Sequence, residues 1–353
     1  MRDIVEEQPE NVRFLQSESA AKQHPGDMTH KQHPIGSGFT AASTADDVLV
    51  GIDLTGKNVI VTGGHAGLGL ETTRALAKAG ASVTVAARDP ERAARAVAGI
   101  ARVEVSPLDL IDPKSIDAFA TRWLDSGRPL HILINNAALP APREIARDAR
   151  GYESQFATNH LGHFQLTLAL LPALRLAHGA RVVNVSSGAH RMGEIRWDDL
   201  HFAKGYDSTL AYAQSKRANV LFAVELDRRY AQDGIRAYAV HPGVIVGTTL
   251  NSAAGPDALR AMGLIDEAGR PIIDPERGKK TPQQGASTSV FAATSPFLSA
   301  IGGVYLKDND ISPLDDEQRP LTADSIPADA TSPSIDPESA QRLWVVSQEL
   351  LKA

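Results

Sequence analysis

Short, continuous apolar segments alternate with longer segments of helical periodicity between about residues 51 and 310, and this alternation constrains the fold more than any other feature. Runs that are apolar at every position are typical of strands buried on both faces. The expected strands cover 58–62, 82–86, 102–105, 131–134, 181–185, 235–240 and 303–306. Helices are expected over 70–79, 90–98, 116–124, 152–176 and 211–231. The pattern predicts an α/β fold in which a doubly wound parallel sheet forms a single domain.

Three stretches lie outside this alternation. Residues 1–50 are polar, and we expect an N-terminal arm that is mobile or draped over the domain. Residues 251–285 follow the sixth strand and are rich in Gly and Pro, yet they carry Met262 and Leu264, which predicts a substrate lid; the alternative is a surface loop packed on its own domain. Residues 311–353 form a C-terminal extension ending in an amphipathic helix over 337–351. The main domain is therefore expected to cover 51–310.

Composition narrows the classes of function. The chain has 353 residues and a formal net charge of −6, which argues against nucleic acid as a partner. It contains no cysteine, so disulfides and thiolate metal sites are excluded. The longest apolar run, residues 166–174, is far shorter than the roughly 18 residues of a membrane span. We expect a cytoplasmic protein without a membrane span. His160 and His163 are three residues apart, but nothing completes a metal cage, so no metal is expected.

A glycine-rich turn separates the first strand from the first helix. Its sequence is Thr62-Gly-Gly-His-Ala-Gly-Leu-Gly69, with the glycines that matter at 63, 67 and 69. Glycine permits a tight turn and lets the backbone approach a pyrophosphate, whose charge then lies at the helix N-terminus. Between a strand and a helix, this turn predicts nucleotide binding.

Ligands of doubly wound sheets bind beyond the carboxyl ends of the strands, so the residues that follow each strand are candidates for the site. Those residues are Asp109, Leu110, Asn136, Ala137, Ser186, Ser187, Pro242, Gly243, Ile245 and Thr248.

Tyr212 and Lys216 are four residues apart on an expected helix, so their side chains project from the same face. A free tyrosine has a pKa near 10 and is a poor base at neutral pH. A neighbouring lysine cation favours the phenolate, so we expect the pKa of Tyr212 to be lowered. A serine such as Ser187 can donate a hydrogen bond to a substrate oxygen as charge develops there. Together these residues predict proton transfer to or from an oxygen.

The motifs resemble those of the short-chain dehydrogenase/reductase family over residues 55–310, in the family's order. The glycine turn matches TGxxxGxG, Asn135-Asn-Ala137 matches NNAG except that Ala138 replaces the glycine, and Tyr212 to Lys216 matches YxxxK. The sequences of the segments NHLGHF, VVNVSS and SKRANVLF resemble those of the retinol-dehydrogenase-like and WW-domain-oxidoreductase-like branch most. The resemblance implies a Rossmann fold and an NAD(P)-dependent oxidoreductase.

The resemblance also implies roles for residues. Ser187, rather than Ser186, would orient the substrate carbonyl, Tyr212 would be the acid or base, and Lys216 would hold the ribose and tune the tyrosine. Asn159 would distort its helix and hold a water in a proton relay; the alternative is a core asparagine that caps backbone groups. The cofactor would contact Gly63, His65, Gly67, Leu68, Gly69, Arg88, Asp109, Leu110, Asn136, Ala137, Tyr212, Lys216, Pro242, Gly243, Ile245 and Thr248.

Arg88 follows the second strand, where the chain meets the ribose 2′ position. An acidic residue there accepts the 2′-OH of NAD, whereas an arginine accommodates the 2′-phosphate of NADP. Ala87 occupies the expected acidic position and Asp89 follows Arg88. We therefore expect a preference for NADP(H), with NAD(H) left open.

The expected function is hydride transfer between nicotinamide and a ketone, an aldehyde or a secondary alcohol. The substrate would be a small molecule, and the apolar side chains of the expected lid favour an apolar one. Whether the protein forms a homo-oligomer is left open. Two alternatives remain. One is a catalytically silent nucleotide-binding sensor or scaffold. The other is an NAD(P)-dependent epimerase or dehydratase, although those carry TGxxGxxG, which Ala66 interrupts here.

Overall fold

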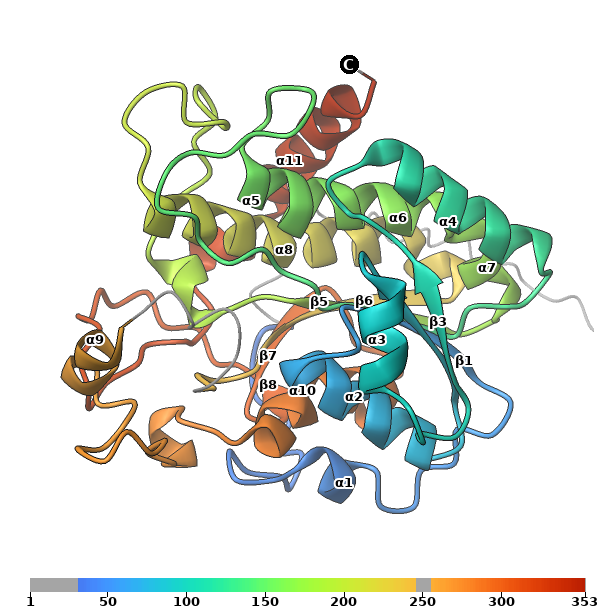
Figure 1. Ribbon diagram of the computed structural model, residues 1–353, viewed down its shortest axis with the longest axis horizontal. Coiled ribbons are helices and arrows are strands. Elements are labelled where there is room, and N and C mark those ends of the chain that lie inside the picture. Colours follow the sequence, from blue (N-terminus) through green and yellow to red (C-terminus); the bar gives the residue numbers. More distant parts are fainter. Residues whose placement is uncertain (1–30, 246–254, 353) are drawn as a thin grey trace, which may run out of the picture.

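A computed structural model describes residues 31–245 and 255–352 (Figure 1). Its described residues form one sheet of eight strands in the order β3-β2-β1-β4-β5-β6-β7-β8. All neighbouring strands are parallel except β7 and β8. The strands are β1 Asn58–Thr62, β2 Ser82–Ala87, β3 Val103–Pro107, β4 Ile132–Asn135, β5 Ala180–Val185, β6 Ile235–His241, β7 Val304–Lys307 and β8 Asp310–Ile311. The predicted doubly wound α/β fold is confirmed.

Helices cover both faces of the sheet (Figure 1). One layer contains α1 Ala45–Val48, α2 Gly67–Lys78, α3 Pro90–Ala96 and α10 Pro282–Thr294. The other contains α4 Pro113–Asp125, α5 Ser154–Phe156, α6 His163–Ala169, α7 Leu171–Leu176, α8 Ser208–Tyr230 and α11 Pro337–Leu350. A separate short helix, α9 Pro256–Ala261, lies at the left of Figure 1.

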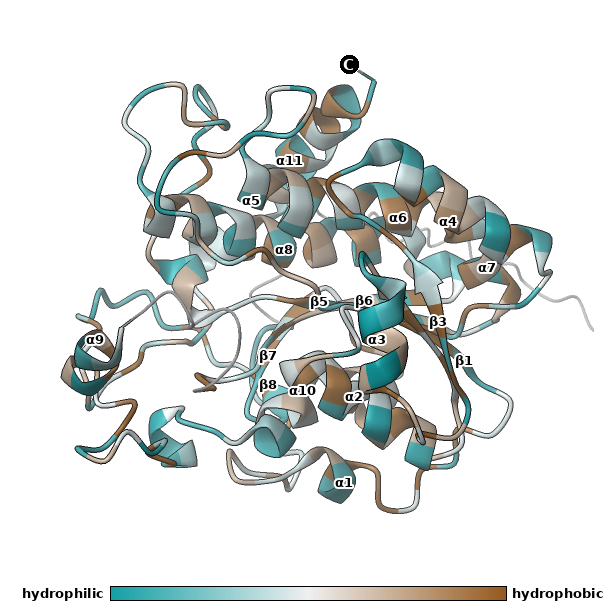
Figure 2. Cartoon of the chain, in the orientation of Figure 1, coloured by the Kyte–Doolittle hydropathy of each residue, from teal (hydrophilic) through white to brown (hydrophobic). Residues whose placement is uncertain are grey.

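The apolar runs exist because the central strands supply both cores. On β1, Val59 and Val61 pack with α2 and α10, whereas Ile60 packs with α4 and α8 on the opposite face. All three side chains are fully buried. Successive strand residues point to opposite faces, so a strand covered on both sides must be apolar throughout. Figure 2 shows hydrophobic residues along β1 and β3, and hydrophilic ones on the outward side of α3.

The helix expected over 152–176 is interrupted twice. Ala157–Gly162 forms a π-helical stretch between α5 and α6, and α7 begins anew at Leu171. Pro172 explains the second break, because proline lacks the N–H that would continue α6. The first break was not visible as a sequence pattern, since it inserts an extra residue into a regular apolar stretch.

The sheet does not end at the strand expected over 303–306. β8 pairs antiparallel with β7, through a turn in which Asp308 and Asn309 have positive φ angles of 54° and 64°. Beyond β8 lies part of the polar arm. The buried Gln32 side chain donates to the carbonyls of Tyr305 and Ser312, each at 2.7 Å, and accepts from the Tyr305 N–H at 2.9 Å. The arm from residue 31 onward is therefore draped over the edge of the sheet.

The segment 251–285, for which a lid was expected and which we call the lid segment, is described from residue 255 onward, and it has structure of its own. Asp274 and Lys279 exchange backbone hydrogen bonds, and Leu264 is buried while Met262 is 43% exposed. The segment ends inside α10, whose start carries a capping box between Thr281 and Gln284. That T-x-x-Q signal predicts a helix start, and the sequence analysis missed it.

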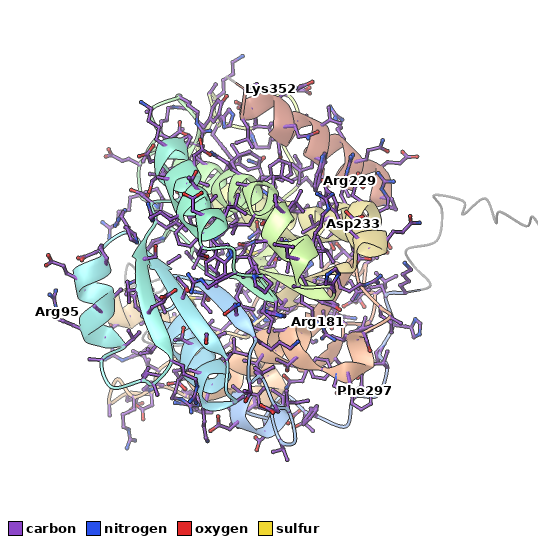
Figure 3. The ribbon with its side chains drawn as sticks, turned by 90° about the vertical axis from the view of Figure 1, so that its right-hand side faces the viewer. Arg95, Arg181, Arg229, Asp233, Phe297 and Lys352 are labelled. Carbon is purple, nitrogen blue, oxygen red and sulfur yellow. The ribbon has the colours of Figure 1, made fainter. Side chains whose placement is uncertain are left out.

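The amino ends of the strands carry no part of the motif series. There Arg181, at the start of β5, donates to the Ala292 carbonyl of α10 at 3.1 Å and lies beside the Tyr238 ring (Figure 3). Desolvation by burial lowers the pKa of Arg181. The candidate site is therefore sought at the opposite edge, beyond the carboxyl ends of the strands.

Candidate active site

The strand order places a crevice at the carboxyl ends of β1 and β4. These strands are neighbours, yet the chain continues from β1 to β2 on one side and from β4 to β5 on the other. At such a switch point the connecting loops separate and leave room for a ligand. The glycine turn follows β1 and Asn135–Ala137 follows β4, so the topology brings these two predicted elements together.

The glycine turn is packed too tightly for side chains. Gly63 has a φ of 65°, and a Cβ on Gly69 would lie 2.3 Å from the Gly63 carbonyl oxygen. Helix α2 then begins at Gly67, preceded by Ala66, and no described side chain caps this end. Its first N–H groups are therefore free to bind an anion. The turn fits the pyrophosphate of a dinucleotide.

Thr62 joins the two sides of the crevice. Its hydroxyl oxygen accepts from the backbone N–H groups of Asn136 and Ala137, at 2.9 and 3.0 Å. The Asn136 amide in turn donates to the Thr62 carbonyl at 2.9 Å. These bonds hold the residues after β4 against the start of the glycine turn.

His163 extends this network to Asn159, and the sequence analysis did not assign it a role. Its Nδ1 is 3.0 Å from the Asn159 carbonyl, and its Nε2 is 2.9 Å from the Thr62 hydroxyl. Because a carbonyl only accepts, Nδ1 carries the proton, and Nε2 accepts from Thr62. Burial lowers the pKa of His163 to about 4, so the ring is neutral. His163 thus connects the cofactor crevice to the π-helical stretch.

Asn159 lies in that π-helical stretch with its side chain fully engaged. Its carbonyl oxygen accepts from the Leu139 N–H at 2.8 Å, and its amide donates to the Ser215 hydroxyl at 3.0 Å. Ser215 donates to the Tyr212 carbonyl at 2.8 Å. Asn159 therefore lies in a distorted helix and caps the backbone N–H of Leu139, while its role in a proton relay stays a prediction. π-Helical insertions are frequently found at functional sites.

The two serines after β5 have different partners. Ser186 is buried, and its hydroxyl donates to the Lys216 carbonyl at 2.8 Å. Ser187 is partly exposed; its hydroxyl accepts from the Ala189 N–H at 3.2 Å and lies near enough to the Tyr212 hydroxyl to influence its pKa. Ser187, Tyr212 and Lys216 thus share one region, at the carboxyl end of β5 and the first turns of α8.

The electrostatics of this group differ from the expectation. Burial raises the pKa of Tyr212 to about 12, although the neighbouring Ser187 hydroxyl acts in the opposite direction. Lys216 is 2% exposed, and burial lowers its pKa to about 8. Its Nζ donates to the Val185 carbonyl at 3.0 Å and lies 5.5 Å from the centre of the Tyr212 ring. The predicted lowering of the tyrosine pKa by lysine is therefore wrong for this structure, in which desolvation raises that pKa and the opposing contribution comes from Ser187.

Two exposed arginines, Arg88 and Arg92, lie at the end of β2 and the start of α3. Arg88 is exposed, and the Asp89 side chain accepts from the Arg92 N–H at 2.9 Å as the N-cap of α3. His65 is half-buried; burial, and then the Arg92 cation, lowers its pKa. The sequence analysis missed Arg92, although its spacing of four from Arg88 at a helix start was a usable signal.

The remaining predicted cofactor residues line the same edge. Asp109 accepts from the Ile111 N–H at 3.2 Å, and Leu110 packs so closely on Gly162 that a Cβ there would lie 2.2 Å from the Leu110 carbonyl. Leu68 and Ile245 converge on Gly285 of α10, where a Cβ would lie 2.6 and 2.8 Å from their side chains.

Pro242 and Gly243 follow β6, and Gly243 has a φ of 87°. Thr248 lies outside the described residues.

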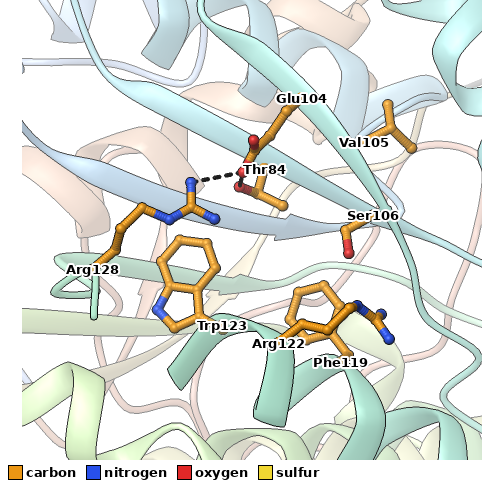
Figure 4. A pocket seen from close by; sticks show the side chains of 8 residues that line it. All are labelled: Thr84, Glu104, Val105, Ser106, Phe119, Arg122, Trp123 and Arg128. Carbon is orange, nitrogen blue, oxygen red and sulfur yellow. Dashed lines mark hydrogen bonds and ion pairs between the residues drawn. The ribbon is translucent and has the colours of Figure 1, made fainter. Parts of the chain in front are cut away.

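Two cavities of similar size differ in whether they adjoin the candidate site. One, of about 200 Å³, adjoins His241 and is otherwise lined by residues of 276–278, 307–308 and 324–328. The other, of about 190 Å³, lies between β3 and α4, where Arg128 pairs with Glu104 at 2.7 Å and lies over Trp123 (Figure 4). The second cavity shares no residue with the predicted site.

The described helices include none that is both long and apolar enough to cross a bilayer. His160 and His163 have separate partners: His160 Nε2 is 2.8 Å from the Ser347 hydroxyl, and His163 binds Thr62 and Asn159.

A parallel sheet with a glycine turn at its switch point, and with Ser187, Tyr212 and Lys216 at the next strand end, defines a dinucleotide-binding oxidoreductase. Residues 57–258 match the family model for short chain dehydrogenase. The chain belongs to the short-chain dehydrogenase/reductase family of oxidoreductases, whose members use NAD(H) or NADP(H), and the predicted membership is confirmed.

Individual relatives agree with this assignment. A probable oxidoreductase from Streptomyces antibioticus is 44% identical over 310 residues, which cover 86% of this chain and 100% of that protein. Retinol dehydrogenase 12 from Homo sapiens is 38% identical over 307 residues, covering 85% and 88% of the two chains. The structure of an active-site complex of RhlG with NADP from Pseudomonas aeruginosa has a TM-score of 0.57 and 25% identity, covering 73% of this chain and 97% of that one.

Proposed function

We propose that the protein is an NADP(H)-dependent oxidoreductase that interconverts a carbonyl compound and the corresponding alcohol, with Tyr212 as the acid and base. The observation that carries this proposal is the grouping of Ser187 and Tyr212 beside the buried Lys216, whose Nζ lies 5.5 Å from the centre of the Tyr212 ring, one strand away from the crevice with the glycine turn. A substrate oxygen that approaches this pair meets two hydroxyl groups. Both can donate a hydrogen bond to it.

The bound cofactor supplies or accepts the hydride, and the protein manages the proton and the oxygen. Ser187 donates a hydrogen bond to the carbonyl oxygen and stabilises the charge that develops there. Tyr212 delivers its proton to that oxygen in reduction and takes it back in oxidation. Lys216 places an ammonium group beside Ser187 and Tyr212. Its positive charge favours the phenolate form of Tyr212 after the tyrosine has lost its proton.

The preference for NADP(H) is supported by the end of β2. Arg88 lies just before the N-cap of α3 and Arg92 lies in its first turn, and Asp89 caps α3 through its carboxylate. An acidic side chain committed to a helix cap is less suited to accept a ribose hydroxyl, whereas two guanidinium groups favour a phosphate. The RhlG structure is described as a complex with NADP, which agrees with this preference.

The test is consumption of NADPH over a panel of aldehydes and ketones, comparing the wild-type protein with Tyr212→Phe. Loss of the hydroxyl should lower turnover by about 10²–10⁴-fold, with little change in the dissociation constant for NADPH. Tyr152→Phe is a matched control, because the Tyr152 hydroxyl donates to the Leu350 carbonyl of the C-terminal helix segment at 3.2 Å.

Near-normal turnover in Tyr212→Phe would exclude the mechanism. A wild-type protein that binds NADPH yet consumes none with any member of the panel would favour the silent sensor. Product formation without net cofactor change would favour an epimerase or dehydratase.

A further inference from the structure

The loop that carries Ser187 also holds a part of the C-terminal extension. Residues 314–330 form a loop, which we name the C-terminal loop, and its two ends lie side by side. Leu314 and Ala330 form a bridge there, and the Asp315 N–H donates to the Ala330 carbonyl at 2.8 Å. The loop is thus closed at its base, and its two ends can move only together.

Arg191 binds both ends of this base from the 3-10 turn Gly188–Arg191 that follows Ser187. Its Nη1 donates to the carbonyls of Asp315 and Asp329, at 2.7 and 3.0 Å, and its Nη2 donates to the Glu317 carbonyl at 2.7 Å. The side chain is 7% exposed, and its ion pair with Asp315 is 3.7 Å. One buried guanidinium group therefore satisfies three backbone carbonyls of a segment without a helix or sheet of its own.

A second set of contacts joins the same two segments. His190 donates from Nδ1 to the Ser187 carbonyl at 2.7 Å, and its ring packs 4.7 Å from the ring of Tyr305. The Tyr305 hydroxyl donates to the Ala328 carbonyl at 3.0 Å. Gly188 faces Ala328 so closely that a Cβ there would lie 3.0 Å from the Ala328 Cβ. The C-terminal loop thus covers the residue next to Ser187.

The far part of the loop reaches the lid segment. A Cβ on Gly263 would lie 2.8 Å from the Cβ of Ala323. The cavity of about 200 Å³ lies between the lid residues 276–278, the loop residues 324–328 and His241. His241 accepts from the Gly188 N–H at 3.0 Å, so this cavity and the Ser187 loop share a wall.

We propose that Arg191 is a positioning residue that fixes the C-terminal loop against the Ser187 loop and thereby sets the position of the wall that faces the substrate. This inference rests on the proposed function for its kinetic part. The contacts predict coupling between the two loops, because Arg191 is covalently part of one and holds both ends of the other. Removing its donors leaves three carbonyls without their partner, and the loop should then open as a unit.

The test uses the full-length protein with Arg191→Met, which keeps an apolar stem and removes all donors. Arg319→Met is the matched control: Arg319 pairs with Asp315 and Glu317 in the same loop, but it is 44% exposed. Hydrogen exchange should speed up together in 314–330 and 187–192 in Arg191→Met, and in neither segment in Arg319→Met. With a carbonyl substrate found in the panel above, KM should rise about tenfold or more, while the dissociation constant for NADPH changes less than about twofold.

Unchanged exchange in 314–330, or faster exchange in that segment without a rise in KM, would overturn the proposal. So would a fall in kcat at unchanged KM, because Arg191 would then act on Ser187 alone. If Arg191→Met does not fold, Tyr305→Phe tests the same coupling by removing only the bond to Ala328, and it should raise exchange and KM in the same direction. Hydrogen exchange needs no substrate, so absence of turnover in the wild-type protein contradicts the proposed function and leaves the loop coupling to be decided separately.

Discussion

The Ser186 hydroxyl donates a 2.8 Å hydrogen bond to the backbone carbonyl of Lys216. This bond ties the end of β5 to α8 one turn beyond Tyr212. Lys216 returns a bond to β5, from its Nζ to the Val185 carbonyl at 3.0 Å. Two reciprocal contacts therefore set the height of α8 relative to the strand, and they leave Ser187 on the side of Tyr212.

The two serines should respond differently to removal of the hydroxyl. Ser187→Ala should lower kcat by roughly 10²–10³-fold, since it removes a donor to the developing oxyanion, with little change in the midpoint of thermal unfolding. Ser186→Ala should lower the free energy of unfolding by about 1 kcal/mol, because it removes the buried bond to Lys216, and should affect kcat less. Steady-state kinetics and urea unfolding of both variants measure this contrast, and a reversed pattern would assign the carbonyl contact to Ser186.

Cofactor preference should depend on Arg88. Arg88→Ala should weaken NADPH binding by about 10–100-fold and leave NADH binding nearly unchanged, because only the phosphate loses a charge-assisted hydrogen bond. Arg95 is a suitable control, since it lies in the last turn of α3 and projects from the surface (Figure 3). Titration of both cofactors into Arg88→Ala and Arg95→Ala measures the effect. Equal losses for NADPH and NADH in Arg88→Ala would show that the residue does not read the phosphate.

Gln32 should contribute to stability far more than its place in a polar arm suggests. Its amide makes three hydrogen bonds to the backbone of Tyr305 and Ser312, and its side chain is buried. Gln32→Ala removes the Gln32 bonds to the Tyr305 N–H and the Ser312 carbonyl, whereas the Tyr305 carbonyl keeps the Ser312 N–H, so the free energy of unfolding should fall by roughly 2–3 kcal/mol. His33→Ala, at an exposed position next to it, is the control. Urea unfolding with equal midpoints for Gln32→Ala and the wild-type protein would contradict this role.

The strands and the glycine turn could be predicted from the sequence because their signals are local. A strand buried on both faces must be apolar at each position, as Val59, Ile60 and Val61 are, and a tight turn needs glycine at Gly63 and Gly69. Gln32 and His163 could not be found in this way. Their partners lie 273 and 101 residues away, in Tyr305 and Thr62, and no spacing in the sequence records such pairs.

The pKa of Tyr212 illustrates the same limit. The spacing of Tyr212 and Lys216 predicted their common face, and the two side chains do lie together. It could not predict the balance between the lysine charge and desolvation, because burial depends on how α8 packs against β5. Burial raises the pKa of Tyr212 to about 12 and lowers the pKa of Lys216 to about 8.

Buried histidines should make the native state sensitive to acid. Burial lowers the pKa of His160 to about 3 and the pKa of His190 to about 4, from an ordinary value of 6.5. A histidine whose pKa is lower in the folded than in the unfolded chain takes up a proton when the chain unfolds at a pH between the two values. The free energy of unfolding therefore falls as the pH falls below about 6.5.

For His160 alone, the loss should reach about 2 kcal/mol between pH 7.5 and pH 5, because the folded state stays unprotonated over that range. His160→Gln removes this titration and keeps a polar group opposite the Ser347 hydroxyl, which His160 Nε2 contacts at 2.8 Å. Urea unfolding at several pH values should show a shallower pH dependence in His160→Gln than in the wild-type protein, while the exposed control His33→Gln keeps the wild-type slope. Parallel slopes in all three proteins would mean that His160 is not buried as a neutral ring.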